Sequence, residues 1–133
     1  MPLSELVAPL SDLSLYLLRL MLGALFATSG WSHLTRPVER GQSIGLPPGL
    51  TRVVGLAEIV GAASLVLGLY AQVGAVLLIG VMLGAIRKKI FVWKTGFWGE
   101  RGQGWFHDLL YLVCNLVIVG TGGGAIAITR PLF

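Results

Sequence analysis

The stretch Leu13–Leu34, LSLYLLRLMLGALFATSGWSHL, decides the fold of this chain, because it is apolar almost throughout and carries one permanent charge, Arg19. A helix needs roughly 20 mostly apolar residues to cross the hydrocarbon core of a bilayer. Ser11 and Asp12 precede the stretch as typical helix N-caps, and a proline at position 37 follows it. The stretch therefore predicts a transmembrane helix over residues 13–34.

Three further apolar segments follow, over residues 50–70, 72–92 and 105–128. Beyond Arg52 at its start, the first of these contains a single charge, Glu58, and the next begins so soon after it that the two predict a tight helical hairpin. The last segment loosens at the glycine run 122–124, so its tail either completes a span or folds back. The chain is therefore expected to be all-α, an integral membrane four-helix bundle that forms one domain over residues 1–133.

The composition agrees with a chain whose main partner is the lipid bilayer. It is 55% hydrophobic and 12% charged, whereas a soluble domain has about 25% charged residues. The net charge of +4 does not indicate a nucleic-acid partner, because the basic residues lie in the breaks between apolar segments. Cys114 is the only cysteine, which excludes an intrachain disulfide and a CxxC motif. The N-terminus lacks the basic region of a cleavable signal peptide, so the first span is expected to remain.

The basic residues also predict an orientation. If four segments span, the loops at 35–52 and 87–104 share one side of the membrane, and both termini share the other side. Of the 10 Lys and Arg residues, Arg130 lies on the side of the termini, and most of the others lie on the loop side: Arg36, Arg40, Arg52, Arg87, Lys88, Lys89, Lys94 and Arg101. Positive residues favour the cytoplasmic side, so a multi-pass protein of a bacterial inner membrane with both termini outside is expected.

Arg19 and Glu58 are charges within predicted spans. An unpaired charge at the centre of a membrane helix costs about 2.5 to 3.5 kcal/mol. Each residue lies roughly 10 Å from an end of its segment, so their backbones are expected at depths about 10 Å apart, within reach of extended side chains. We therefore predict that Arg19 and Glu58 pair, either to fix the helix register or to form a polar site.

Helical spacing adds further residues to this site. One stripe of the first segment, at steps of three and four residues, holds Arg19, Gly23, Phe26, Gly30 and His33. A second stripe, on the last segment, holds His107, Tyr111, Cys114 and Asn115. Folded together, these stripes are expected to form one cavity that opens toward the cytoplasm and is lined by His33, Glu58, His107, Asp108 and Tyr111. The candidate ligand-binding residues are Arg19, His33, Glu58, His107 and Tyr111.

Such a cavity fits a quinone better than other cofactors, because a quinone needs only apolar walls and a few polar groups for its carbonyl oxygens. The two histidines could bind haem, but their spacing does not require it, and no metal site is expected. Cys114 is interpreted as a packing residue rather than a reactive thiol. The alternative function is a small transporter, channel or lipid-handling protein in which Glu58 serves proton or solute passage.

Small residues recur at close spacing in two segments and permit close approach of helices. They are Gly23, Ala27 and Gly30 in the first segment, and Gly80 and Gly84 in the third. This spacing indicates packing within the bundle, with a homo-oligomer as the alternative.

Three stretches resemble the DoxX-like family of small membrane proteins. LLRLMLGALFATSGWSHL (17–34) is similar to that family's opening LRL-x-LG-x-x-F-x-x-SG-x-x-KL, and VVGLAEIVGAASLVLGLYAQVGAVLL (53–78) to its GLxE-x-x-GG core and following hairpin. DLLYLVCNLVIVGTGGGAIAITRPL (108–132) looks like a looser version of the terminal helix and its G-x-G-x-x-S-L-D-R close. Arg19 and Glu58 match the pattern. His33 stands where the family commonly has lysine, and Thr129 where it usually has aspartate.

The resemblance implies a four-helix protein whose relatives include a membrane subunit of thiosulfate:quinone oxidoreductase and proteins linked to oxidoreductases or thiol stress. The hypothesis is a quinone-linked subunit, or a membrane anchor, for a partner oxidoreductase. The sequence contains no dinucleotide, iron–sulfur or flavin motif. Enzyme activity is therefore expected at most as part of a complex, with electrons supplied by the partner.

Overall fold

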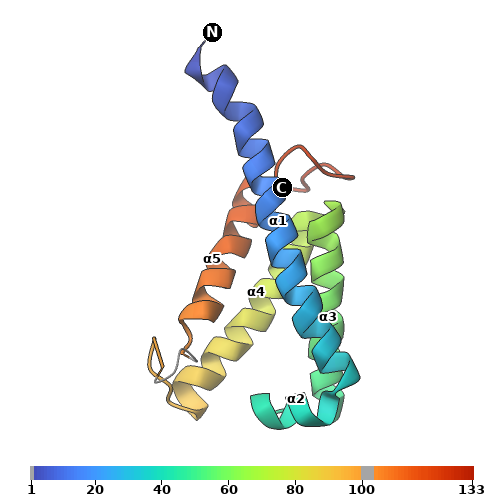
Figure 1. Cartoon of the computed structure of the whole chain (residues 1–133), viewed down its shortest axis with the longest axis vertical. Coiled ribbons are helices and arrows are strands. Elements are labelled where there is room, and N and C mark those ends of the chain that lie inside the picture. The colour runs from blue at the N-terminus through green and yellow to red at the C-terminus, as the bar shows by residue number, and fades with distance from the viewer. Residues whose placement is uncertain (1, 100–103) are drawn as a thin grey trace.

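The computed structural model describes residues 2–99 and 104–133, and within these ranges the chain is helical and has no strands. This confirms the all-α prediction. Figure 1 shows the arrangement of five α-helices and one π-helical segment: α1 (Leu3–Thr35), α2 (Pro37–Ile44), α3 (Pro48–Leu67), α4 (Ala71–Arg87), η1 (Lys88–Val92) and α5 (Phe106–Thr121).

Helix α1 is longer than predicted. Its 33 residues extend about 50 Å at 1.5 Å per residue, and its first turns stand clear of the other helices in Figure 1. The predicted helix start at Ser11 and Asp12 is wrong, because the helix begins at Leu3 and includes Pro9. Asp12 does not cap the helix, since its Oδ1 atom accepts a hydrogen bond of 3.0 Å from the backbone N–H of Ala125.

Helices α3 and α4 are joined by a short turn in which Gly68 and Tyr70 have left-handed backbone angles, φ 69° and 51°. Helix α4 runs directly into η1, so the helical path continues from Ala71 to Val92. We call the end of the molecule that holds the α3–α4 turn the turn end. The opposite end, where α2 and η1 lie, is called the basic end.

The residues after α5 fold back across the turn end. The predicted fourth segment reached residue 128, but α5 ends at Thr121, because Gly122, Gly123 and Gly124 have positive φ angles of 81°, 86° and 90°. The tail is then held by the backbone N–H groups of residues 128 and 129, which donate to the carbonyl groups of residues 67 and 68. Gln72 also binds it, through the N–H groups of Leu132 and Phe133 and the carbonyl of Phe133.

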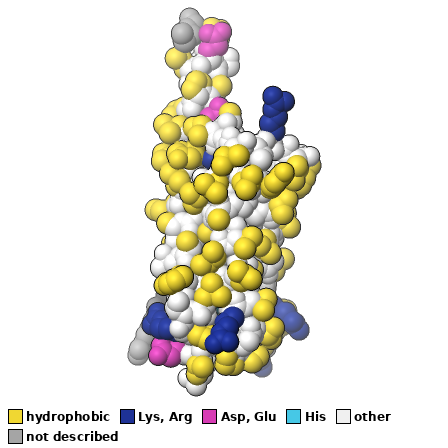
Figure 2. Space-filling view, turned by 90° about the vertical axis from the view of Figure 1, so that its right-hand side faces the viewer, with side chains coloured by type: hydrophobic (Ala, Val, Ile, Leu, Met, Phe, Trp, Pro, Cys, Tyr) yellow, Lys and Arg dark blue, Asp and Glu magenta, His cyan; other side chains and the backbone are white. Residues whose placement is uncertain are grey.

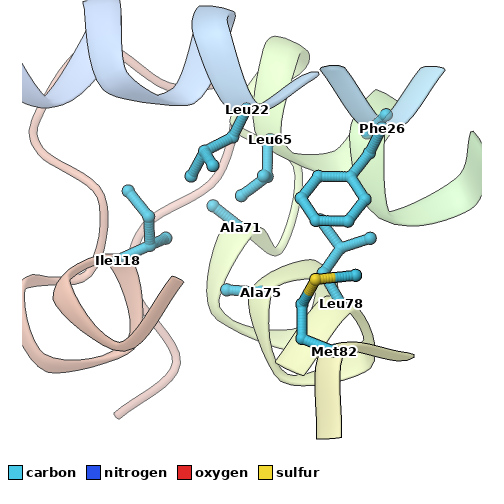
Figure 3. Close-up of a cluster of buried hydrophobic side chains, with 9 residues drawn as sticks. Leu22, Phe26, Leu65, Ala71, Ala75, Leu78, Met82 and Ile118 are labelled. Atoms are coloured by element: carbon cyan, nitrogen blue, oxygen red, sulfur yellow. The ribbon is translucent and has the colours of Figure 1, made fainter. Parts of the chain in front are cut away.

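A buried apolar cluster joins α1, α3, α4 and α5. Figure 3 shows how side chains from these helices converge, and the cluster consists of Leu22, Phe26, Ala62, Leu65, Ala71, Ala75, Leu78, Met82 and Ile118. Tyr111 and Cys114 pack against it, as expected of Cys114 as a packing residue.

The outer surface is also apolar. Large exposed hydrophobic side chains cover the flank shown in Figure 2, while Lys and Arg side chains gather mainly at the basic end. Two helices, α1 and α3, are long and apolar enough to cross a membrane, and α5 is a shorter apolar helix. This surface is the one expected of helices whose outer faces contact lipid.

Glycines allow α1 and α3 to pack closely. A Cβ atom added to Gly30 would lie 2.7 Å from the carbonyl oxygen of Gly55, and one added to Gly55 would lie 2.8 Å from that of Gly30. Gly23 makes a second close approach, to Val66 and Ala62. The small residues predicted to permit close helix contact are therefore used within the chain at these positions.

Candidate functional site

Glu58 is paired with His33 beside a close backbone contact between α1 and α3. The Oε1 atom of Glu58 lies 2.8 Å from Nδ1 of His33. The two residues are 2% and 5% exposed, so the pair is shielded from solvent by the protein itself. It lies beside the contact between Gly30 and Gly55, because a Cβ atom on Gly55 would be 2.9 Å from the Cβ of His33. The glycine contact therefore sets the separation of the two ionisable side chains.

The second nitrogen of His33 faces a guanidinium group. Nη2 of Arg40, on α2, lies 3.4 Å from Nε2 of His33, and Oγ of Ser29 lies 3.5 Å from Nδ1. An arginine can only donate, so Nε2 is assigned as the acceptor and Nδ1 as the nitrogen that carries the proton toward Glu58. A neutral imidazole in this tautomer links the cation of Arg40 to the carboxylate of Glu58.

A groove of about 480 Å³ lies on the outer side of α1 next to this pair. Its far part is apolar and its mouth at the basic end is cationic, and it is lined by Met21, Ala24, Leu25, Thr28, Ser29, Ser32, Arg36 and Arg40. Ser29 and Arg40 both line the groove and contact His33. These two side chains connect the exposed outer side of α1 with the buried carboxylate.

The structure does not form the predicted pair of Arg19 with Glu58. Arg19 is fully buried, but it lies at the turn end, where Nη2 donates a hydrogen bond to the carbonyl of Ile126 and the guanidinium lies 5.4 Å from the ring centre of Tyr16. Glu58 instead lies level with Gly30 on α1, since a Cβ atom added to Gly30 would lie 3.1 Å from the Cβ of Glu58. Gly30 is 11 residues beyond Arg19, about 16 Å along the helix, which is farther than the two side chains reach. The sequence estimate of about 10 Å was therefore too small.

The stripe on α1 is confirmed, because Arg19, Gly23, Phe26, Gly30 and His33 are all buried. It does not form one site, since its first and last polar members lie at opposite ends of the bundle. In the described part of the chain, Nε and Nη1 of Arg19 have no hydrogen-bond partner. Arg19 is therefore part of the contact with the tail rather than of the pair at the basic end.

His107 and Tyr111 lie on α5 and contact one another. Their ring centres are 6.4 Å apart in a stacked arrangement, and the ring of Tyr111 meets that of Phe26 edge-on at 6.0 Å. Asp108 forms an ion pair of 2.8 Å with Lys89. Among the described residues, no hydrogen bond or ion pair links these side chains with His33 or Glu58. The residues predicted to line one cavity thus form two separate polar groups at the basic end. One contains His33 and Glu58, and the other contains His107, Asp108 and Tyr111.

Sequence reasoning missed Ser29, Arg40 and Lys89. Ser29 could have been found, because it precedes His33 by four residues on the same helix. Arg40 has no such signal, since it reaches His33 only after α2 turns back beneath α1. The described residues hold no group of three or more His, Cys, Asp or Glu side chains placed to bind a metal ion.

Comparison with known proteins gives one finding. No curated protein and no solved structure shows significant similarity to the chain. The family model described as DoxX matches residues 14–96, which contain α2, α3, α4 and most of α1, together with the His33–Glu58 pair and the groove. The chain therefore belongs to the DoxX family of membrane proteins.

Proposed function

We propose that the chain is a multi-pass subunit of a bacterial inner membrane in which α1, α3, α4 with η1, and α5 all cross the bilayer. Both termini would lie outside and the basic end would face the cytoplasm. The gathering of Lys and Arg at that end supports this orientation. The exposed apolar flanks of all four helices support contact with lipid.

We further propose that the subunit binds a quinone in the groove on α1 and serves a partner oxidoreductase. The observation that carries this proposal is the contact of two groove-lining side chains, Ser29 and Arg40, with the buried His33–Glu58 pair. A quinone has an apolar tail and a polar ring, and the groove offers apolar walls and a cationic mouth. Arg40 would donate a hydrogen bond to a quinone carbonyl oxygen.

The His33–Glu58 pair would handle protons. Reduction of a quinone to a quinol takes two electrons and two protons, and oxidation of the quinol returns them. The partner oxidoreductase would exchange the electrons. When Arg40 turns from Nε2 of His33 toward an oxygen of the bound ligand, Nε2 becomes free to accept one of the two quinol protons while Nδ1 passes its own proton to Glu58. The second proton would leave through the open side of the groove. The reverse sequence delivers a proton to a quinone.

The position of the groove also weighs against the alternative of a small transporter or channel. Met21, Leu25 and Thr28 are exposed on the outer side of α1, so the groove is open to a ligand that arrives through the bilayer. A transported solute would need a path between the helices that includes Glu58. Transport into proteoliposomes that disappears in Glu58→Gln, without quinone binding, would favour the alternative.

The test is quinone binding by the purified protein in lipid nanodiscs, with a short-chain ubiquinone as the probe. Arg40→Gln is expected to weaken binding at least tenfold, because it removes the charged donor at the mouth. Arg52→Gln is the matched control, since Arg52 is exposed near the same end but does not line the groove. Absence of quinone binding, or equal binding by both variants, would refute the proposal.

A further inference from the structure

The N-terminal part of α1 presents side chains that nothing in the molecule covers. Residues 3–11 are all exposed, and Figure 1 shows this part of the helix projecting beyond the turn end. It contains Leu3, Leu6 and Leu10, which are 74%, 56% and 60% exposed. A projecting helix with so many exposed leucines is expected to pack against a partner surface.

The leucines follow the spacing of a coiled-coil seam. Leu3, Leu6, Leu10, Leu13 and Leu17 are separated by alternating steps of three and four residues, as at the a and d positions of a heptad repeat. Leu13 and Leu17 are 47% and 55% exposed. Since each residue turns about 100°, Leu17 lies on the opposite side of α1 from the buried Arg19. The five leucines form a narrow stripe, here called the leucine seam, that faces away from the bundle.

A membrane surface is a poor partner for this seam. Helices that lie on lipid headgroups combine a broad apolar face with Lys and Arg on the polar face. The first basic residue of the chain is Arg19, and the charges before it are Glu5 and Asp12. These two acids are seven residues apart, at the same heptad position, which lies outside the a and d seam. Neither would face its own copy across a symmetric contact.

We propose that the leucine seam packs against the same seam of a second copy of this chain, forming a parallel two-stranded coiled coil and hence a dimer. Two copies in one bilayer with the same topology present their α1 helices in parallel, so identical a and d layers meet without a change of register. Pro9 falls at a flanking g position, beside the seam. The groove begins at Met21, beyond the last leucine of the seam.

Oxidative cross-linking tests this proposal on the full chain in liposomes at a low protein-to-lipid ratio. The native cysteine is first replaced by Cys114→Ser, and single cysteines are then introduced as Leu6→Cys, Leu10→Cys or, as the matched control, Ala8→Cys. Ala8 is also exposed and lies between them, but at the outward f position. We expect Leu6→Cys and Leu10→Cys to form cross-linked dimers at least ten times more efficiently than Ala8→Cys.

Equal cross-linking at all three positions, or none at any, would overturn the proposal. Quenching of labelled Leu10→Cys by a lipid-dissolved quencher, without cross-linking, would show that the seam rests on the membrane and would also overturn it. Leu10→Glu gives a second measurement that keeps the native cysteine. Leu10 is 60% exposed and lies outside the buried cluster, so this variant is expected to fold. Its mass in detergent should shift from dimer to monomer, and an unchanged mass would contradict a leucine-seam dimer.

Discussion

Replacing Gly55 by alanine places a methyl group in the close backbone contact between α1 and α3. The added Cβ atom would lie 2.8 Å from the carbonyl oxygen of Gly30 and 2.9 Å from the Cβ of His33, whereas ordinary contact starts at 3.4 Å. To bring the 2.8 Å approach to the Gly30 oxygen up to the 3.4 Å of ordinary contact, the helices must separate locally by about 0.6 Å. Because one of the contacted atoms is a backbone oxygen, the neighbouring atoms can move aside only a little. The substitution is therefore expected to lower the free energy of unfolding by about 1 to 3 kcal/mol, as in other overpacked interiors.

The same separation should lengthen the 2.8 Å contact between His33 and Glu58. The free energy of unfolding in mixed micelles measures the first effect, and quinone affinity measures the second. Gly80→Ala is the matched control, because a Cβ atom at Gly80 meets nothing within 4 Å, and alanine favours a helix over glycine by up to about 1 kcal/mol. If Gly55→Ala were as stable as Gly80→Ala, the close packing of α1 on α3 would be wrong.

Two further variants probe the ends of the bundle. Gln72→Leu should free the tail, because the amide group of Gln72 makes hydrogen bonds to residues 119, 132 and 133 that contribute about 1 kcal/mol each. Amide exchange over residues 122–133 should quicken, while Gln42→Leu, at an exposed position, should leave it unchanged. Lys89→Met should lower the free energy of unfolding by about 2 kcal/mol by leaving the buried Asp108 carboxylate without its cation. Adding Asp108→Asn should restore most of that loss, and no recovery would show that Lys89 acts through packing alone.

Sequence periodicity predicted which face of α1 is buried. Its stripe from Arg19 to His33 is buried at each predicted position, because spacing along a helix fixes direction around its axis. Spacing does not fix depth relative to another helix, and the partner of Glu58 depended on depth. The start of α1 was misplaced for a related reason, because Asp12 can cap a helix or bind a distant backbone N–H, and the choice depends on where the tail lies.

The tail shows a second limit of the sequence. The glycine run 122–124 permits either a loose span or a reversal, and the residues that decide between them are far away in sequence. Gln72 and Gly68 supply hydrogen-bonding groups to the tail, and Arg19 donates to Ile126. The sequence shows each of these donor and acceptor residues but not that they lie close together. Their convergence follows only from the packing of α1, α3, α4 and α5 at one end.

The register between α1 and α3 explains which groups pair with Glu58 and with Arg19. A Cβ atom on Gly23 would approach the carbonyl of Ala62, and one on Gly30 would approach that of Gly55. A step of seven residues forward along α1 thus matches seven residues backward along α3, as antiparallel helices require. Arg19, one turn before Gly23, must then lie beyond Ala62, toward the end of α3.

That end is the α3–α4 turn, where a Cβ atom on Gly68 would lie 2.7 Å from Nη1 of Arg19. Moving Arg19 level with Glu58 would require a slide of about 16 Å, or three helical turns, which would drive side chains into both glycine contacts. The glycines therefore exclude Arg19 and select His33 as the partner of Glu58. His33 stands where the DoxX pattern commonly has lysine, so this register also predicts that either histidine or lysine at position 33 can pair with Glu58. His33→Lys should therefore retain the free energy of unfolding. His33→Leu leaves the carboxylate unpaired and should lower the free energy of unfolding by about 3 kcal/mol.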